Sequence, residues 1–157
     1  MAGSGAAPAD ARGAYDAMIR DVISPAMRAL GFKGSGGSYV LPVASAWVLV
    51  GFQRSVHDDR ELVEFTVNLT VASKRAWEAV RLERPYLSER PAPNTRYGPP
   101  TWQRRLGALM SAQTDVWWRV TVDSDVGRVG DEVVTAVREY AVPMFEREVA
   151  RLRDETP

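Results

Sequence analysis

The sequence contains no cysteine and only one histidine, His57. The absence of cysteine excludes disulfide bonds, thiolate metal sites, iron–sulfur clusters and cysteine nucleophiles. A single histidine excludes metal sites built from two or three histidines. A Ser–His–Asp triad would have to use His57 in a sequence that lacks the Gly-x-Ser-x-Gly motif. We therefore expect no metal and no cofactor.

Long apolar runs and lysine are also scarce. The longest apolar run covers residues 46–51 and is far shorter than the roughly 20 residues that span a bilayer. Residues 1–9 contain no basic residue and no apolar stretch, which argues against a signal peptide and favours a flexible tail. These features predict a cytoplasmic protein that does not contact membranes. Lysine occurs only at Lys33 and Lys74 beside abundant arginine, which suggests a GC-rich bacterial genome.

Two amphipathic helices are predicted near the ends of the chain. Apolar residues recur at helical spacing over residues 10–30 and again over residues 129–152. Pro25 and Pro143 interrupt these patterns. Each helix is therefore expected to kink or restart at its proline, the first with Ser24 as its N-cap.

Alternating apolar and polar residues predict strands over residues 38–41, 46–55, 62–71, 102–109 and 117–123. In the third strand Phe65, Val67 and Leu69 alternate with polar residues, so this side is expected to face the core. In the last strand Trp118, Val120 and Val122 are expected on the core side. Residues 34–37 are expected to form a flexible glycine-rich connection, and Ser73 is expected to cap a short helix.

A proline-rich loop is predicted over residues 84–100, which hold five of the ten prolines and no periodic pattern. We expect this loop to be the least protected part of the chain. Short turns between successive strands favour antiparallel pairing. The sequence therefore predicts a single α+β domain over residues 10–154. Its mostly antiparallel sheet of about five strands is expected to pack on Pro-kinked N- and C-terminal helices.

Five short motifs occur in an order that resembles a bacterial family called domain of unknown function 4304. They are Leu30-Gly31-Phe32-Lys33, Phe52-Gln53-Arg54-Ser55, Phe65-Thr66-Val67-Asn68-Leu69, Arg105-Leu106-Gly107 and Asp115-Val116-Trp117-Trp118. Together they cover most of residues 14–150. The sequence departs from the family in a longer proline-rich insert between Glu83 and Pro100. The resemblance implies the fold and no established activity.

The second face of the predicted sheet has mixed chemistry. If the apolar residues of the strands face the core, Trp47 and Gln53 share the other face with Asn68 by parity, and Trp117 and Arg119 join them. Such a face suits a groove for a flat or peptide-like ligand. In the alternative interpretation, a helix or the proline-rich loop covers this face. The candidate binding residues are Trp47, Gln53, Asn68, Arg105, Trp117 and Arg119.

The segment from Lys74 to Arg105 holds eight basic residues against three glutamates, although the whole chain has a formal net charge of zero. Arginines interleaved with aromatic residues are typical of nucleic-acid surfaces and also of protein interfaces. The zero net charge makes a nucleic-acid partner the less favoured of the two. A protein partner or a small ligand is the preferred interpretation.

The other polar motifs have ordinary structural explanations. His57-Asp58-Asp59 and the pair Asp123 and Asp125 fall in predicted turns, where such residues are common, and Asp125 can cap the last helix. The glycine-rich connection lies between a helix and a strand, which is the reverse of a phosphate-binding loop.

The favoured function is a non-enzymatic binding module that recognises a protein partner or a small ligand through this mixed face and the cationic loop. Immunity proteins encoded beside toxins are an analogy for such a module. The alternative is a small cofactor-independent enzyme of specialised metabolism. It would use Asp115 or Glu64 as general acid or base beside Trp117 and Arg119.

Overall fold

The computed structural model describes residues 7–110 and 116–155. Within this part of the chain, six antiparallel strands form one sheet in the order β1-β2-β3-β4-β5, with β6 also paired to β4. The predicted α+β fold is confirmed. The strands are β1 (Lys33–Ser35), β2 (Ser38–Leu41), β3 (Ala46–Arg54), β4 (Val63–Ser73), β5 (Trp102–Arg105) and β6 (Trp118–Val120).

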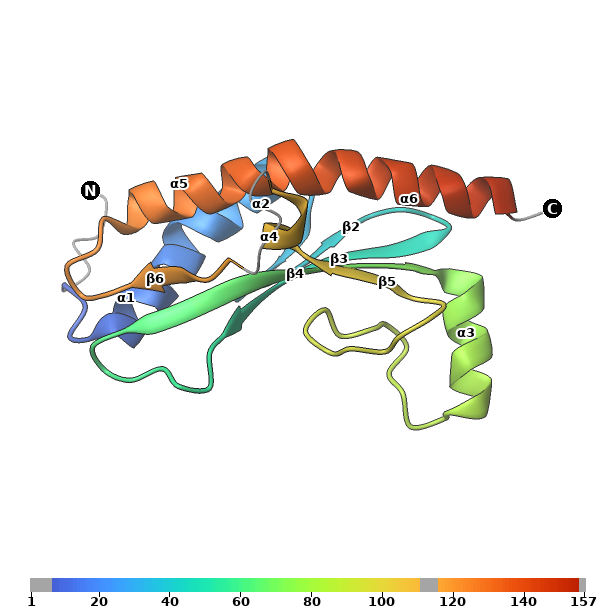
Figure 1. The fold of residues 1–157 in the computed structure, drawn as a ribbon, viewed down its shortest axis with the longest axis horizontal. Helices are drawn as coiled ribbons and strands as arrows, with labels where there is room; N and C mark the ends of the chain where they lie inside the picture. Colours follow the sequence, from blue (N-terminus) through green and yellow to red (C-terminus); the bar gives the residue numbers. More distant parts are fainter. Residues whose placement is uncertain (1–6, 111–115, 156–157) are drawn as a thin grey trace.

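Two long helical stretches cover one face of the sheet (Figure 1). The N-terminal stretch comprises α1 (Ala11–Met18), η1 (Ile19–Ile23) and α2 (Ser24–Ala29). The C-terminal stretch comprises α5 (Val126–Ala136), η2 (Val137–Ala141) and α6 (Val142–Glu155). The short helix α4 (Leu106–Leu109) follows β5. On the other side of the sheet, α3 (Lys74–Glu83) leads into residues 84–101, which contain no helix or strand (Figure 1).

Each long stretch contains a five-residue π-helical segment shortly before its proline. The backbone N–H of Ser24 bonds to the carbonyl of Ile19, and that of Val142 bonds to Val137, so each bond reaches back five residues. Proline lacks an N–H and clashes with the carbonyl four residues before it, and the wider π turn absorbs this mismatch without a break. The prediction that Ser24 is an N-cap is wrong. Its hydroxyl lies instead 2.7 Å from the Tyr39 hydroxyl, inside the protein.

The main core lies between the helices and one face of β3 and β4. Phe65 is fully buried, and its ring stacks on Phe52 and Trp118 at centroid distances of 6.0 and 5.8 Å. Tyr15 of α1 meets the same ring at 5.3 Å. Gly130 of α5 allows η1 to approach closely, because a Cβ there would lie 2.5 Å from Val22 Cγ1. The core face predicted for residues 62–71 is therefore the one that the helices bury.

Three local predictions need correction. The glycine-rich connection at residues 34–37 belongs to a tight hairpin: Lys33–Ser35 pairs with β2, and Gly36 and Gly37 form its turn with φ of 66° and 88°. Both angles lie in the left-handed region that a type I′ turn requires. Residues 106–109 form α4 and do not continue β5. Val122 lies beyond β6 and is exposed, whereas Val120 is buried.

Replacement of Phe65 tests this core. Phe65→Ala removes a fully buried ring that three other aromatic rings contact, so the free energy of unfolding should fall by about 3 kcal/mol or more. Urea denaturation monitored by circular dichroism measures the change. Val56→Ala is the control, because Val56 is exposed and its truncation should change stability by less than about 0.5 kcal/mol. Equal effects of the two substitutions would contradict the core assignment.

Candidate functional site

Strand pairing places most of the candidate binding residues on one face of the sheet, as the alternation predicted. In the β3–β4 register, Trp47 lies opposite Ala72, Gly51 opposite Asn68 and Gln53 opposite Thr66. In the neighbouring ladders, Arg105 pairs with Asn68 and Arg119 with Glu64. The guanidinium of Arg105 lies 5.3 Å from the centre of the Trp117 ring. Phe65, Val67 and Leu69 occupy the opposite, helix-covered face.

This second face is covered along its middle by residues 84–101. The approach is close at Gly51, where an added Cβ would collide with the Asn94 side chain and would lie 2.8 Å from Pro93 Cβ. Asn94 Nδ2 also donates a hydrogen bond of 3.1 Å to the Phe52 carbonyl. Leu49 and Thr70 of this face are fully buried. At the centre of this face, the structure therefore agrees with the alternative interpretation, in which the proline-rich loop covers the sheet.

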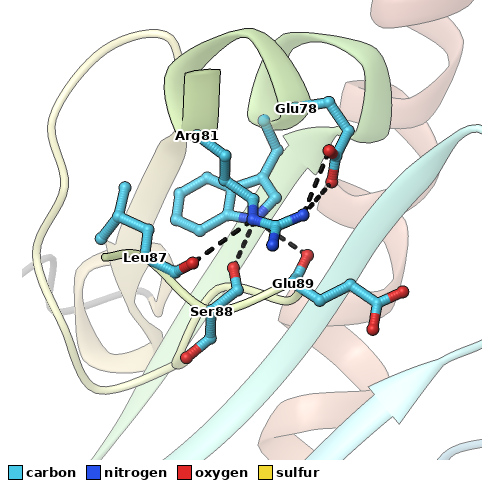
Figure 2. Close-up of polar contacts among 6 residues, drawn as sticks. Glu78, Arg81, Leu87, Ser88 and Glu89 are labelled. Carbon is cyan, nitrogen blue, oxygen red and sulfur yellow. Dashed lines mark hydrogen bonds and ion pairs between the residues drawn. The ribbon is translucent and has the colours of Figure 1, made fainter. Parts of the chain in front are cut away.

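The loop is held in place by helix α3. The indole N–H of Trp77 donates to the carbonyls of Ser88 and Glu89 at 3.2 and 3.0 Å. Arg81 donates to the Leu87 carbonyl and pairs with Glu78 at 2.8 Å, so the loop carbonyls converge on one face of α3 (Figure 2). The Tyr97 ring packs edge-on against Trp77 with a centroid distance of 4.9 Å. Helix and loop thus form one docked unit, and the prediction that the loop is the least protected part of the chain stays a prediction.

A polar pocket of about 230 Å³ remains where the loop meets β4 and β5. Arg96, Arg104 and Arg105 border it, but the Arg104 side chain lies over Trp102 on the helix-covered face, so only Arg96 and Arg105 offer guanidinium groups on the pocket side. Four amide side chains also line it, and none of the described lining residues is acidic; the amides are Gln53, Asn68, Asn94 and Gln103. The pocket is therefore suited to a ligand that offers hydrogen-bond acceptors or negative charge.

The amide side chains form a directed hydrogen-bond network. Asn68 Nδ2 donates to Gln53 Oε1 at 2.7 Å and to Asn94 Oδ1 at 2.9 Å, which uses both of its hydrogens. Gln103 spans the loop, because its Oε1 accepts from the Tyr97 backbone N–H and its Nε2 donates to the Thr95 carbonyl. Gln103 therefore holds the loop side of the pocket, and Asn68 joins the sheet to the loop.

The pocket brings together three of the six predicted binding residues, Gln53, Asn68 and Arg105, with Trp117 packed against Arg105. Trp47 lies in a separate recess beside Arg90 and Pro93, with the Lys74 ammonium 4.5 Å from its ring centre. Arg119 is exposed on β6 and does not line the pocket.

The sequence-based site omitted Asn94, Arg96 and Gln103. Parity along β5 would have placed Gln103 on the same face as Arg105. No pattern in the sequence shows which residues Asn94 contacts, because a loop has no periodic spacing.

The described residues place no carboxylate in the pocket. Glu64 is half-buried on β4 opposite Arg119, and Asp115 lies outside the described residues. Burial raises the pKa of Tyr15 and of Tyr39, both on the helix-covered side of the sheet. The backbone N–H groups of Glu61 and Leu62 lower the pKa of the Asp59 carboxyl in an exposed turn. Within residues 7–110 and 116–155, no cluster of three or more potential metal-ligating side chains was found.

Residues 23–147 match the family model described as domain of unknown function, DUF4304. The chain belongs to this family. Neither the curated proteins nor the solved structures include a significant match to it. Among the described helices, none combines the length and apolar character needed to cross a membrane. The family membership supports the fold, and the function has to be argued from the site itself.

Two buried threonines on β4 provide a matched test of the covered face. Thr66 Oγ1 donates to the Val116 carbonyl at 3.1 Å, whereas the Thr70 hydroxyl has no hydrogen-bond partner among the described residues. Thr70→Val should leave the free energy of unfolding unchanged or raise it by about 1 kcal/mol, because an unpaired buried hydroxyl is removed. Thr66→Val should lower it by about 1 kcal/mol. Urea denaturation of both variants checks the pair, and a larger loss in Thr70→Val would contradict the assignment.

Loop docking can be tested at Gly51. Gly51→Ala places a methyl group against Pro93 and Asn94, so the loop should lift while the sheet stays folded. Trypsin should then cleave at the exposed Arg90 and Arg96 faster than in the wild type. Gly127→Ala is the control, because its Cβ would meet only Asp125 Oδ1 at an ordinary 3.4 Å. Unchanged cleavage of Gly51→Ala would show that the loop does not depend on this contact.

Proposed function

We propose that this protein is a non-enzymatic, cytoplasmic binding module that recognises a small polar ligand or the end of a partner protein in the pocket. The recognition groups are Gln53, Asn68 and Arg105, together with Arg96. Trp117 supports Arg105 by stacking against its guanidinium. The observation that carries the proposal is the composition of the lining, with six amide or guanidinium side chains and no acidic group among the described residues.

This composition favours binding over acid–base catalysis. General acid–base catalysis needs a group that exchanges a proton within hydrogen-bond reach of the substrate, and amides and arginines do not do so near neutral pH. The same side chains supply directional hydrogen bonds, which specify a ligand. The enzyme alternative would use Asp115 or Glu64 as its acid or base. Glu64 pairs across the β4–β6 ladder with Arg119 and does not line the pocket, and Asp115 lies outside the described residues.

The size of the ligand determines how much of the second face contributes to binding. A small ligand would contact only the pocket, whereas a protein partner would also reach Trp47 and Arg119, which lie outside it. A partner toxin, as in immunity proteins, is one form of the second case. Nucleic acid is the less favoured partner, because the chain has a formal net charge of zero.

Equilibrium dialysis against a defined panel tests the proposal. The panel contains sugars, nucleosides, amino acids, organic acids, nucleotides and short peptides, each quantified by mass spectrometry. The wild type should retain at least one compound. Asn68→Ala should lose that retention, because it removes the donor that joins Gln53 to Asn94. The matched control is Arg147→Ala, an exposed residue of α6 on the helix side of the sheet (Figure 1).

Two results would contradict the proposal. If the wild type retains no compound, the pocket is not a ligand site. Time-dependent consumption of a panel compound, abolished by Glu64→Gln or by Asp115→Asn, would favour the carboxylate enzyme instead. Additional weakening of a retained peptide by Trp47→Ala or Arg119→Ala would indicate a partner that spreads over the face.

A further inference from the structure

We propose that the protein has a second binding site, an edge pocket beside Tyr15 that takes a neutral, hydroxyl-rich ligand such as a sugar. The volume of the edge pocket is about 560 Å³, which lies within the usual range for small-molecule sites. Its lining overlaps with that of the pocket beside β5 only at Gln53 and Asn94. The edge pocket is therefore a different site from the one in the proposed function.

The edge pocket lies where β3 extends past its neighbour β2. The β2–β3 ladder ends at Gly51, so residues 52–54 of β3 have no strand beside them on that side. Helix α1 contributes Tyr15 and Asp16 to the lining, and the β1–β2 turn contributes Gly36. Elements from both ends of the hairpin and from the N-terminal helix thus surround one recess.

The Tyr15 hydroxyl is a buried polar group that lacks a partner. Tyr15 lines the edge pocket and is only 6% exposed, yet its hydroxyl forms no hydrogen bond with the described residues. Its ring is fixed between the Phe65 ring at 5.3 Å and the Arg54 guanidinium at 5.9 Å. Buried tyrosine hydroxyls usually find a hydrogen-bond partner. A ligand in the edge pocket would supply the partner that the described chain lacks.

Tyr39 shows the usual arrangement of a buried tyrosine in the same core. Its hydroxyl lies 2.7 Å from the Ser24 hydroxyl and accepts from the Gly37 N–H at 3.3 Å. Tyr39 does not line the edge pocket. The two tyrosines therefore differ in the feature that matters, because only the hydroxyl without a partner belongs to a residue that borders this recess.

The charges around the edge pocket favour a neutral ligand. Two guanidinium groups and two carboxylates line it, those of Arg12, Arg54, Asp16 and Asp58. Burial raises the pKa of Tyr15, Arg54 lowers it, and the two carboxylates raise it, so charges of both signs act on this hydroxyl. An ionic ligand would meet a like charge together with an opposite one. A neutral ligand avoids this repulsion.

Hydroxyl groups suit this lining because each of them can both donate and accept a hydrogen bond. The Tyr15 hydroxyl stays protonated near neutral pH, since burial raises its pKa, and it can donate to a ligand oxygen. Guanidinium groups donate as well, whereas carboxylates accept from ligand hydroxyls. The rings of Tyr15 and Phe52 add apolar surface to the lining. A sugar offers several hydroxyls and an apolar C–H face on one compact ring.

Saturation-transfer NMR titrations of the full chain test this site with matched probes. Glucose, galactose and mannose are the neutral sugars. Glucosamine and glucuronate are the cationic and anionic analogues of glucose, compared at slightly acidic pH where both are ionised. At least one neutral sugar should bind, and both charged analogues should bind about tenfold more weakly than that sugar or not at all.

Two tyrosine variants separate ligand contact from folding. Tyr15→Phe should weaken binding of that sugar by about fivefold and should not lower the melting temperature, because its hydroxyl has no partner in the described chain. Tyr39→Phe should do the reverse, since it removes the hydrogen bond to Ser24 and leaves the edge pocket intact.

Several outcomes would overturn the inference. They are binding of no neutral sugar, equal or tighter binding of a charged analogue, and full sugar affinity in Tyr15→Phe. A lower melting temperature of Tyr15→Phe would show that the hydroxyl is bonded inside the protein and would overturn it too. If Asn68→Ala abolishes sugar binding and Tyr15→Phe does not, the sugar binds in the pocket beside β5. The edge pocket then fails as a site, while the proposed function stands.

Discussion

Burial of β4 on both faces constrains the rest of this structure. β4 pairs with β3 along most of its length, and its other edge is shared by β5 and β6. Phe65, Val67 and Leu69 on one face require an apolar covering, which the two long helical stretches provide. Thr66 and Thr70 on the other face are equally buried, so this polar face requires a covering as well. Helix α3 and residues 84–101 supply it, and the architecture therefore has three layers around one strand.

A proline-rich segment is suited to serve as the third layer. It has few backbone N–H groups to pair, and its prolines restrict the unfolded chain, so its ordering loses less entropy than that of a flexible loop. Side chains of ordered elements then bind its free carbonyls. Trp77 and Arg81 do so from α3, and Gln103 does so from β5. The loop is thus held from two sides without forming a strand of its own.

The pocket exists because of the way in which the proline-rich loop docks on the sheet. Gly51 and Asn68 let the loop approach the sheet closely through Asn94, but the loop then turns away toward Tyr97 and packs on Trp77. Between this turn and β5 a recess remains, and the arginines of both segments line it. The docking of the loop and the composition of the pocket are therefore linked, and movement of the loop would change the ligand site.

Local periodicity in the sequence was enough to assign most of the elements and the two faces of the sheet. Helical spacing identified the terminal helices, and the alternation in β4 assigned Phe65 to the core and Asn68 to the opposite side, because side-chain direction follows local periodicity. It missed β1, since a three-residue strand beside a glycine turn is too short for a periodic pattern. It also placed Val122 in a strand that ends two residues earlier.

Only the tertiary structure decided that Asn94 meets Gly51, that Trp77 holds the loop carbonyls, and that Gln53, Asn68 and Arg105 share a pocket with Arg96. Such contacts join residues far apart in the chain. They depend on complementary shape and paired hydrogen bonds, which no spacing along one segment of the sequence encodes.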